Sequence, residues 1–126
     1  MTRNLAGAIP LRLRPAALIA IKAFHTVVFA SVGAALVVTL IDGAIGRPRR
    51  RTAAAGALVA AETAVFLSNN QVCPFTPLAE ELGAERGSVV DMFLPAAMAR
   101  RIPLVAGTAA ALSMGLNAAA VLRTRR

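Results

Sequence analysis

Three side chains in this sequence could do chemistry, and all three lie in or beside long apolar stretches. Glu62 is a single carboxylate in the middle of the stretch 53–73, which is otherwise free of charge. His25 lies in an earlier apolar stretch, and Cys73 is the only cysteine. An ionisable residue inside a run that can span a membrane is costly, so each one is first a functional-site hypothesis.

Two interpretations of Glu62 stay open. In one, Glu62 carries a proton or a cation through the membrane, because burial in lipid favours its neutral form. In the other, the protonated side chain hydrogen-bonds Ser31, Ser113 or Asn117 and holds helices together. The substitution Glu62→Gln distinguishes them, since it should abolish ion-coupled activity in the first case and leave the fold intact in the second.

His25 is the only histidine of the chain. Imidazole is the commonest metal ligand in proteins, which makes His25 a candidate ligand for haem or a metal ion. A haem held by two histidines would need a second copy of the chain or a partner subunit. The alternative is a structural hydrogen bond to Asn69 or to a backbone carbonyl. No cofactor is predicted, and haem on His25 is kept as the alternative.

Cys73 cannot form a disulfide within the chain, because no second cysteine is present. Dithiol chemistry of the thioredoxin kind is therefore not supported. Cys73 is either a small packed side chain at a helix end or a nucleophile paired with His25.

The composition indicates that lipid surrounds much of the chain. Hydrophobic residues make up 57% of the sequence, against about 45–50% in soluble domains. The net charge of +8 comes from arginines in short runs beside the apolar stretches, as expected for residues that meet lipid head groups. With five Phe and neither Trp nor Tyr, the chain lacks the stacking residues of a nucleic-acid-binding protein.

The pattern predicts an all-α integral membrane bundle that forms a single transmembrane domain over residues 1–126. An apolar run of about 20 residues crosses the hydrocarbon core. Three transmembrane helices are predicted, at 16–41, 53–72 and 102–122. Asp42-Gly43 and Gly46 should end the first. A cleaved signal peptide is the competing interpretation, but the apolar run is far longer than the core of such a peptide.

The segment 73–101 is predicted to hold short helices at the membrane surface. Thr76 resembles a helix N-cap followed by proline, and Gly83 is a stop signal. A second short helix should begin at Ser88, which has capping-box spacing to Asp91.

Arginine density predicts the orientation and the location. The loop 43–52 and the C-terminus share one side of a three-span protein and carry the denser arginines. The positive-inside rule therefore makes that side cytoplasmic. The preference for arginine over lysine, together with the many alanines, suggests a bacterial genome, so the predicted location is the bacterial inner (plasma) membrane.

An antiparallel pairing of the first two spans predicts which polar residues share a depth, because each residue adds about 1.5 Å of rise. His25, Asn69 and Asn70 should lie at one level, just under Cys73. Glu62 should lie at a second level, close to Ser31 to Gly33 and to Ser113. The predicted polar intramembrane residues are His25, Glu62, Asn69, Asn70 and Asn117.

The loop Cys73-Pro74-Phe75-Thr76-Pro77-Leu78 resembles that of a bacterial family of small multi-pass membrane proteins of unknown function. That family carries a Cys-Pro-Leu-Thr-x-Leu-Glu loop and a histidine early in its first helix. The matching residues are Cys73, Pro74, Thr76, Leu78 and His25. Phe75 replaces the family's leucine and Ala79 stands where its glutamate would follow. The resemblance implies a fold and a membrane location but no activity.

The sequence predicts a non-enzymatic accessory or interaction subunit of the membrane. One alternative is a redox subunit that uses His25 to bind haem or a quinone, and another is a transport component that uses Glu62. The predicted partners are the lipid bilayer and either further copies of the chain or a larger membrane complex. No nucleic-acid partner is predicted.

Overall fold

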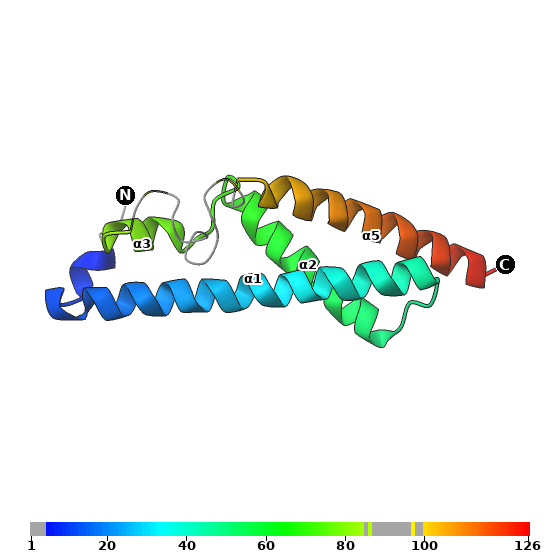
Figure 1. The fold of residues 1–126 in the computed structure, drawn as a ribbon, viewed down its shortest axis with the longest axis horizontal. Coiled ribbons are helices and arrows are strands. Elements are labelled where there is room, and N and C mark those ends of the chain that lie inside the picture. The colour runs from blue at the N-terminus through cyan, green and yellow to red at the C-terminus, as the bar shows by residue number, and fades with distance from the viewer. Residues whose placement is uncertain (1–4, 85, 87–96, 98–99) are drawn as a thin grey trace. The chain divides into compact units, whose positions relative to one another are not determined.

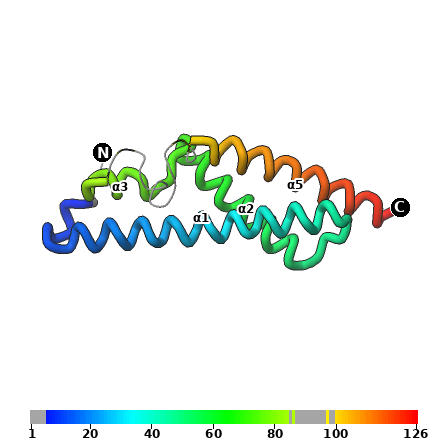
Figure 2. Tube along the Cα trace, in the orientation of Figure 1, coloured from blue at the N-terminus to red at the C-terminus, as the bar shows by residue number. Residues whose placement is uncertain are grey.

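The computed structural model describes residues 5–84, 86, 97 and 100–126. Within these residues every regular element is a helix, which confirms the predicted all-α class (Figure 1, Figure 2). The α-helices are α1 (Arg14–Ile45), α2 (Arg50–Ser68), α3 (Thr76–Glu81) and α5 (Ile102–Thr124). Two short 3-10 helices, Leu5–Ala8 and Leu11–Leu13, precede α1.

The first helix continues past the point where the sequence predicts its end. Asp42 and Gly43 belong to α1, and the chain leaves the helix at Gly46, whose φ is +71°. The Gly46 N–H donates to Gly43 O over 3.1 Å, and the Arg47 N–H donates to Asp42 O over 3.0 Å. This pair of bonds is a Schellman motif, in which glycine takes the left-handed conformation that other residues avoid. Asp42 therefore does not break the helix.

The second helix is shorter than predicted at its C-terminal end. It stops at Ser68, because Asn70 adopts a φ of 55° and the Gln71 N–H donates to Phe66 O over 2.9 Å. Asparagine is among the few residues that enter this conformation readily. At the other end, Thr52 Oγ1 accepts the Arg49 N–H over 2.8 Å, which satisfies a donor that the first helical turn leaves open.

The short helix α3 confirms one element of the predicted segment 73–101. Its cap residue is Phe75 rather than Thr76, and Pro77 occupies the first turn. Gly83 ends it with a φ of +100°, as predicted. The predicted second short helix, from Ser88 to Asp91, lies outside the described residues.

Two helices are long and apolar enough to cross a membrane. They are α1, together with the 3-10 turn before it, and α5. In α5, Pro103 lies in the first turn, where its missing N–H costs little. α2 is less apolar than these two helices and is not among the candidate spans, since it begins with Arg50 and Arg51 and carries Glu62 among its 19 residues.

The chain divides into two compact units. Unit 1 comprises Met1–Val28 and Val65–Ala99, and unit 2 comprises Phe29–Ala64 and Arg100–Arg126. Among the described residues of unit 1 the fully buried side chains are apolar, namely Ala6, Ala79 and Leu82. In unit 2 buried polar side chains accompany the buried apolar ones, namely Thr39, Asp42, Thr52 and Ser113.

Candidate functional site

The structure brings the histidine and the cysteine together in unit 1. His25 is held by α1, and Cys73 follows the left-handed turn that ends α2. The Cys73 thiol and the His25 ring share a hydrogen bond, with Sγ 3.2 Å from Nδ1. Both side chains are partly buried. This contact is the pairing that the sequence left open for Cys73; the other partners predicted for His25 are Asn69 and a backbone carbonyl.

Aromatic and amide side chains next to the pair fix its two segments. The rings of Phe24 and Phe75 meet edge to face, with centroids 5.4 Å apart and planes at 72°. Aromatic pairs favour this geometry. Asn69 uses its amide within the turn, where Nδ2 donates to Val72 O over 2.7 Å. Asn70 is exposed and ends the helix through its backbone.

The loop that begins at Cys73 continues into α3, which one hydrogen bond connects to the N-terminal segment. Pro74 is exposed, whereas Thr76 and Leu78 are partly buried. The Ala6 N–H donates to Glu81 Oε2 over 3.1 Å. This hydrogen bond holds α3, which follows Cys73, against the N-terminal segment of unit 1.

Metal binding has little support in the part of the chain that is described. No group of three or more His, Cys, Asp or Glu side chains there could hold an ion. The pair of His25 and Cys73 supplies two donors, whereas zinc sites use three or four protein ligands. Haem on His25 stays a prediction that no contact in this structure tests.

Glu62 lies partly buried on α2. Within the described part of the chain it makes no hydrogen bond to Ser113 or Asn117, two of its predicted partners. The Asn117 amide donates instead to Ser113 O and to Thr39 O, each over 2.9 Å. Glu62, which is predicted to lie near the membrane midplane, is therefore not hydrogen-bonded to these two residues of α5.

A second polar cluster, which the sequence did not single out, joins α1 to α2 in unit 2. We call it the Asp42 junction, and it consists of Asp42, Arg51 and Thr52. Arg51 donates to both oxygens of Asp42, over 3.0 Å from Nε and 2.5 Å from Nη2, and Thr52 Oγ1 donates to Oδ2 over 2.6 Å. Bidentate pairs of this kind are among the stronger hydrogen bonds in proteins.

Burial distinguishes the two charged members of the Asp42 junction. The Asp42 side chain is 3% exposed, whereas the Arg51 side chain is 58% exposed. The spacing of Asp42 and Arg51 across a loop with Gly46 is the signal in the sequence that could have indicated this pair. The sequence pattern alone predicts only that Asp42 helps to end a helix.

A close approach between α1 and α5 adjoins the junction. A Cβ at Gly43 would lie 2.8 Å from Asn117 Nδ2 and 3.0 Å from Leu116 Cβ. A side chain larger than glycine there would require the Asn117 side chain or α5 to shift. Asn117 Oδ1 is buried without a hydrogen-bond partner among the described residues. Asn117, predicted as an intramembrane polar residue, thus connects helices through its amide nitrogen.

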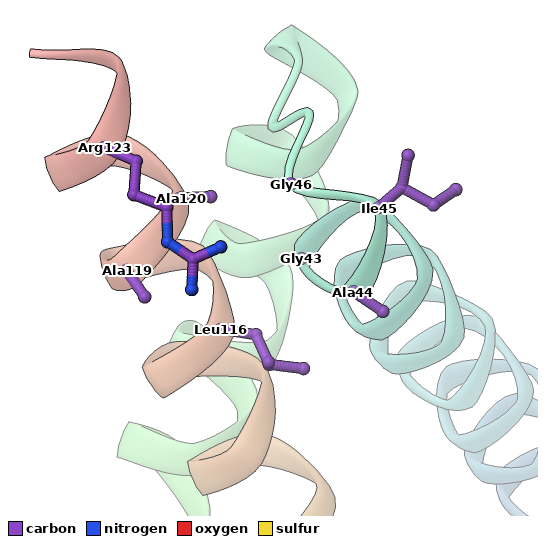
Figure 3. A pocket seen from close by; sticks show the side chains of 8 residues that line it. All are labelled: Gly43, Ala44, Ile45, Gly46, Leu116, Ala119, Ala120 and Arg123. Carbon is purple, nitrogen blue, oxygen red and sulfur yellow. The ribbon is translucent and has the colours of Figure 1, made fainter.

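A small open pocket lies beside this close approach. Its volume is about 190 Å³, smaller than the usual 300–1,000 Å³ of a ligand site. Figure 3 shows Leu116 and Arg123 extending from α5 toward the end of α1. The lining residues are Gly43, Ala44, Ile45, Gly46, Leu116, Ala119, Ala120 and Arg123.

No protein-family model, curated protein or solved structure matches this chain. A function can therefore be proposed only from the residues and contacts of the chain itself.

Proposed function

We propose that the protein is a multi-pass integral membrane protein that serves as a non-enzymatic interaction subunit of the bacterial inner membrane. The observation that carries this proposal is the exposure of the apolar helices. Only 11% of the most apolar window of α1, and 11% of that of α5, is buried. The core helix of a soluble protein would be mostly buried, so these faces require lipid or another protein as a cover.

Individual side chains support the same argument. On α5, Leu104 and Met114 are each 74% exposed, and on α1, Ile19 and Val27 are each 64% exposed. Each exposed large side chain removed from water contributes about 1.5–3 kcal/mol, so a bilayer stabilises this arrangement strongly. The arginines beyond the helix ends can then lie among lipid head groups.

The third crossing is α2. Its 19 residues would extend about 28 Å as an ideal helix, close to the ~30 Å hydrocarbon core. Leu58, Val65 and Leu67 are exposed on it and suit a lipid contact. With three crossings, the connection 46–49 between α1 and α2 and the C-terminus would both lie on the cytoplasmic side, in agreement with the arginine distribution.

The role as a subunit without catalysis is supported by how the polar residues are used. Asn117 and Asn69 direct their amides to backbone carbonyls of the chain itself. Asp42 and Thr52 join α1 to α2. Polar side chains used in this way hold helices together and leave the exposed apolar faces for association with further copies or a larger complex.

Cysteine labelling tests the three crossings. In a Cys73→Ser background, Arg49→Cys reports on the loop after α1 and Gln71→Cys reports on the turn after α2. A membrane-impermeant maleimide added to sealed inverted vesicles should label Arg49→Cys and not Gln71→Cys. Labelling of both positions would exclude α2 as a crossing. Release of the wild-type chain by alkaline carbonate without detergent would contradict the membrane location itself.

Affinity purification from native membranes tests the role as a subunit. We expect co-purification of a larger membrane complex or of further copies of the chain. A Soret band in the purified sample would instead favour the redox alternative through His25. A pH-dependent flux that is lost in Glu62→Gln would favour the transport alternative.

A further inference from the structure

We propose that Cys73 is a thiol that His25 activates for attack on small disulfides, so that the chain accepts one thiol group as a mixed disulfide. The inference rests on the 3.2 Å contact between Sγ and Nδ1. It goes beyond the proposed function and does not depend on it, since the chemistry requires only the pair and a small disulfide.

The contact has the geometry of a nucleophile beside its base. The thiolate, and not the thiol, attacks disulfides and other electrophiles. When neutral His25 carries its proton on Nε2, the Cys73 S–H donates to Nδ1, and after proton transfer the Nδ1–H donates to the thiolate. An adjacent imidazole activates a cysteine in this way. Cys73 is only partly buried, and the proposal requires that a small disulfide approach Sγ from the open side.

The reaction balances without a further oxidant. His25 Nδ1 takes the proton, and the Cys73 thiolate attacks one sulfur of a disulfide R–S–S–R. A bond forms between Sγ and that sulfur, while the R–S–S–R bond breaks and a thiolate leaves. The leaving thiolate takes the proton from His25. The Cys73 sulfur is oxidised and the leaving sulfur is reduced, which accounts for both electrons.

The presence of a single cysteine makes a mixed disulfide with the small molecule the expected product. Since Cys73 is the only cysteine, no second thiol of the chain can displace the added group. The mixed disulfide therefore persists until an external thiol attacks it. The edge-to-face pair of Phe24 and Phe75 fixes the segments on both sides of the site, which keeps His25 and Cys73 in contact.

The described residues of unit 1 also carry other charged side chains. Cations favour a thiolate and carboxylates disfavour it. On the described elements these groups are Arg12, Arg14, Lys22, Glu80, Glu81 and Arg86. All of them remain in a His25→Gln variant, so a comparison of that variant with the wild type isolates the imidazole.

Disulfide-exchange rates across pH test the proposal on the full-length protein in detergent micelles. The probe is dithio-bis-nitrobenzoate, a chromogenic disulfide. At about pH 6.5 we expect His25→Gln to react about tenfold more slowly than the wild type. Above about pH 9.5 the two rates should converge, because accessible thiols are then ionised with or without a base. Incubation of the wild type with oxidised glutathione should add one glutathionyl group per chain.

Three results would overturn the proposal. If the ratio of the wild-type rate to the His25→Gln rate were the same at every pH, His25 would affect only the access of the reagent to Cys73. A disulfide between two copies of the chain in place of the glutathione adduct would exclude the small-molecule reaction. Should His25→Gln fail to fold, the wild-type profile is compared with that of a Cys73→Ser/Ser68→Cys variant, whose thiol lies at the exposed end of α2. Profiles of the same shape would then contradict activation.

Discussion

The His25–Cys73 pair and the Asp42 junction both connect segments through polar side chains, but they do so differently. The pair joins residues 48 positions apart, and both side chains are only partly buried. The junction joins residues 9 and 10 positions apart around an acid that is almost fully buried. A buried charge with all its partners is suited to stability, whereas a reachable nucleophile beside a base is suited to reaction. Substitutions in the junction should therefore cost the most stability.

Asp42→Ala should cause the largest loss of stability. It removes the acceptor of Arg51 and of Thr52, so the end of α1 loses its side-chain connection to the start of α2. We expect a larger fall in melting temperature than for any single glycine or asparagine substitution, measured by circular dichroism in detergent micelles. Asp42→Asn keeps the shape without the charge, and its melting temperature should lie between those of Asp42→Ala and the wild type. The matched change in unit 1, Glu81→Ala, should have little effect on the melting temperature. An equal fall there would contradict the greater contribution of the Asp42 junction to stability.

Gly43→Ala should be the next most destabilising change. Its Cβ would meet Asn117 Nδ2 at 2.8 Å and Leu116 Cβ at 3.0 Å, so the Asn117 amide must leave its place beside Thr39 O or the helices must shift. We expect a net loss of about 1–2 kcal/mol after the better helix propensity of alanine is included. Gly33→Ala is the control in the same helix, because a Cβ there meets nothing within 4 Å. It should gain about 0.5–1 kcal/mol, and the same sign for both would refute the close approach.

Gly46→Ala should cost about 1 kcal/mol, because its φ of +71° is unfavourable for a residue with a Cβ. A Cβ at Gly46 meets no atom within 4 Å, so the cost comes from the backbone alone. Gly83→Ala makes the same change in unit 1, at a φ of +100°. We expect unfolding titrations to give losses of the same sign for both. A gain at either position would contradict the left-handed helix end described there.

Asn117→Ala should have the smallest effect, about 0.6 kcal/mol, which is the average for a hydrogen bond between membrane helices. The variant loses the bond from Asn117 Nδ2 to Thr39 O. It also removes a buried acceptor, Oδ1, that has no partner among the described residues, which offsets part of the cost. Unfolding titrations in detergent measure the difference. A loss of stability as large as that of Asp42→Ala would show that the contact of α5 with α1, and not the Asp42 junction, contributes most to the stability of unit 2.

The helices were predictable because long apolar runs leave few alternatives. The predicted limits 102–122 lie within α5, and those of the first span, 16–41, lie within α1. The ends were less predictable, because hydrogen bonds at Asn70 and Gly46 decide where a helix stops. Asp42 next to a glycine has the composition of a helix stop. It stays helical because Arg51 and Thr52 satisfy its carboxylate.

The pairing of Cys73 with His25 was one of the alternatives that the sequence left open, but nothing in the sequence ranked it above a hydrogen bond from His25 to Asn69 or to a backbone carbonyl. The antiparallel register placed His25 just under Cys73, and the structure has the two in contact. The register cannot choose between partners at one level, and Asn69 donates instead to Val72 O. The hydrogen bond predicted from Glu62 to Ser31, Ser113 or Asn117 stays a prediction, and the Asn117 amide nitrogen donates to Thr39 O and Ser113 O among the described residues.

The length of α1 has a consequence for the membrane that would hold it. Its 32 residues extend about 48 Å as an ideal helix, roughly 18 Å more than the ~30 Å of hydrocarbon in an average bilayer. Such a mismatch in thickness is relieved by tilt, by a thicker bilayer or by a helix end that projects into the water, each at a fraction of a kcal/mol per Å. The chain would therefore favour the thicker regions of a membrane over the thinner ones.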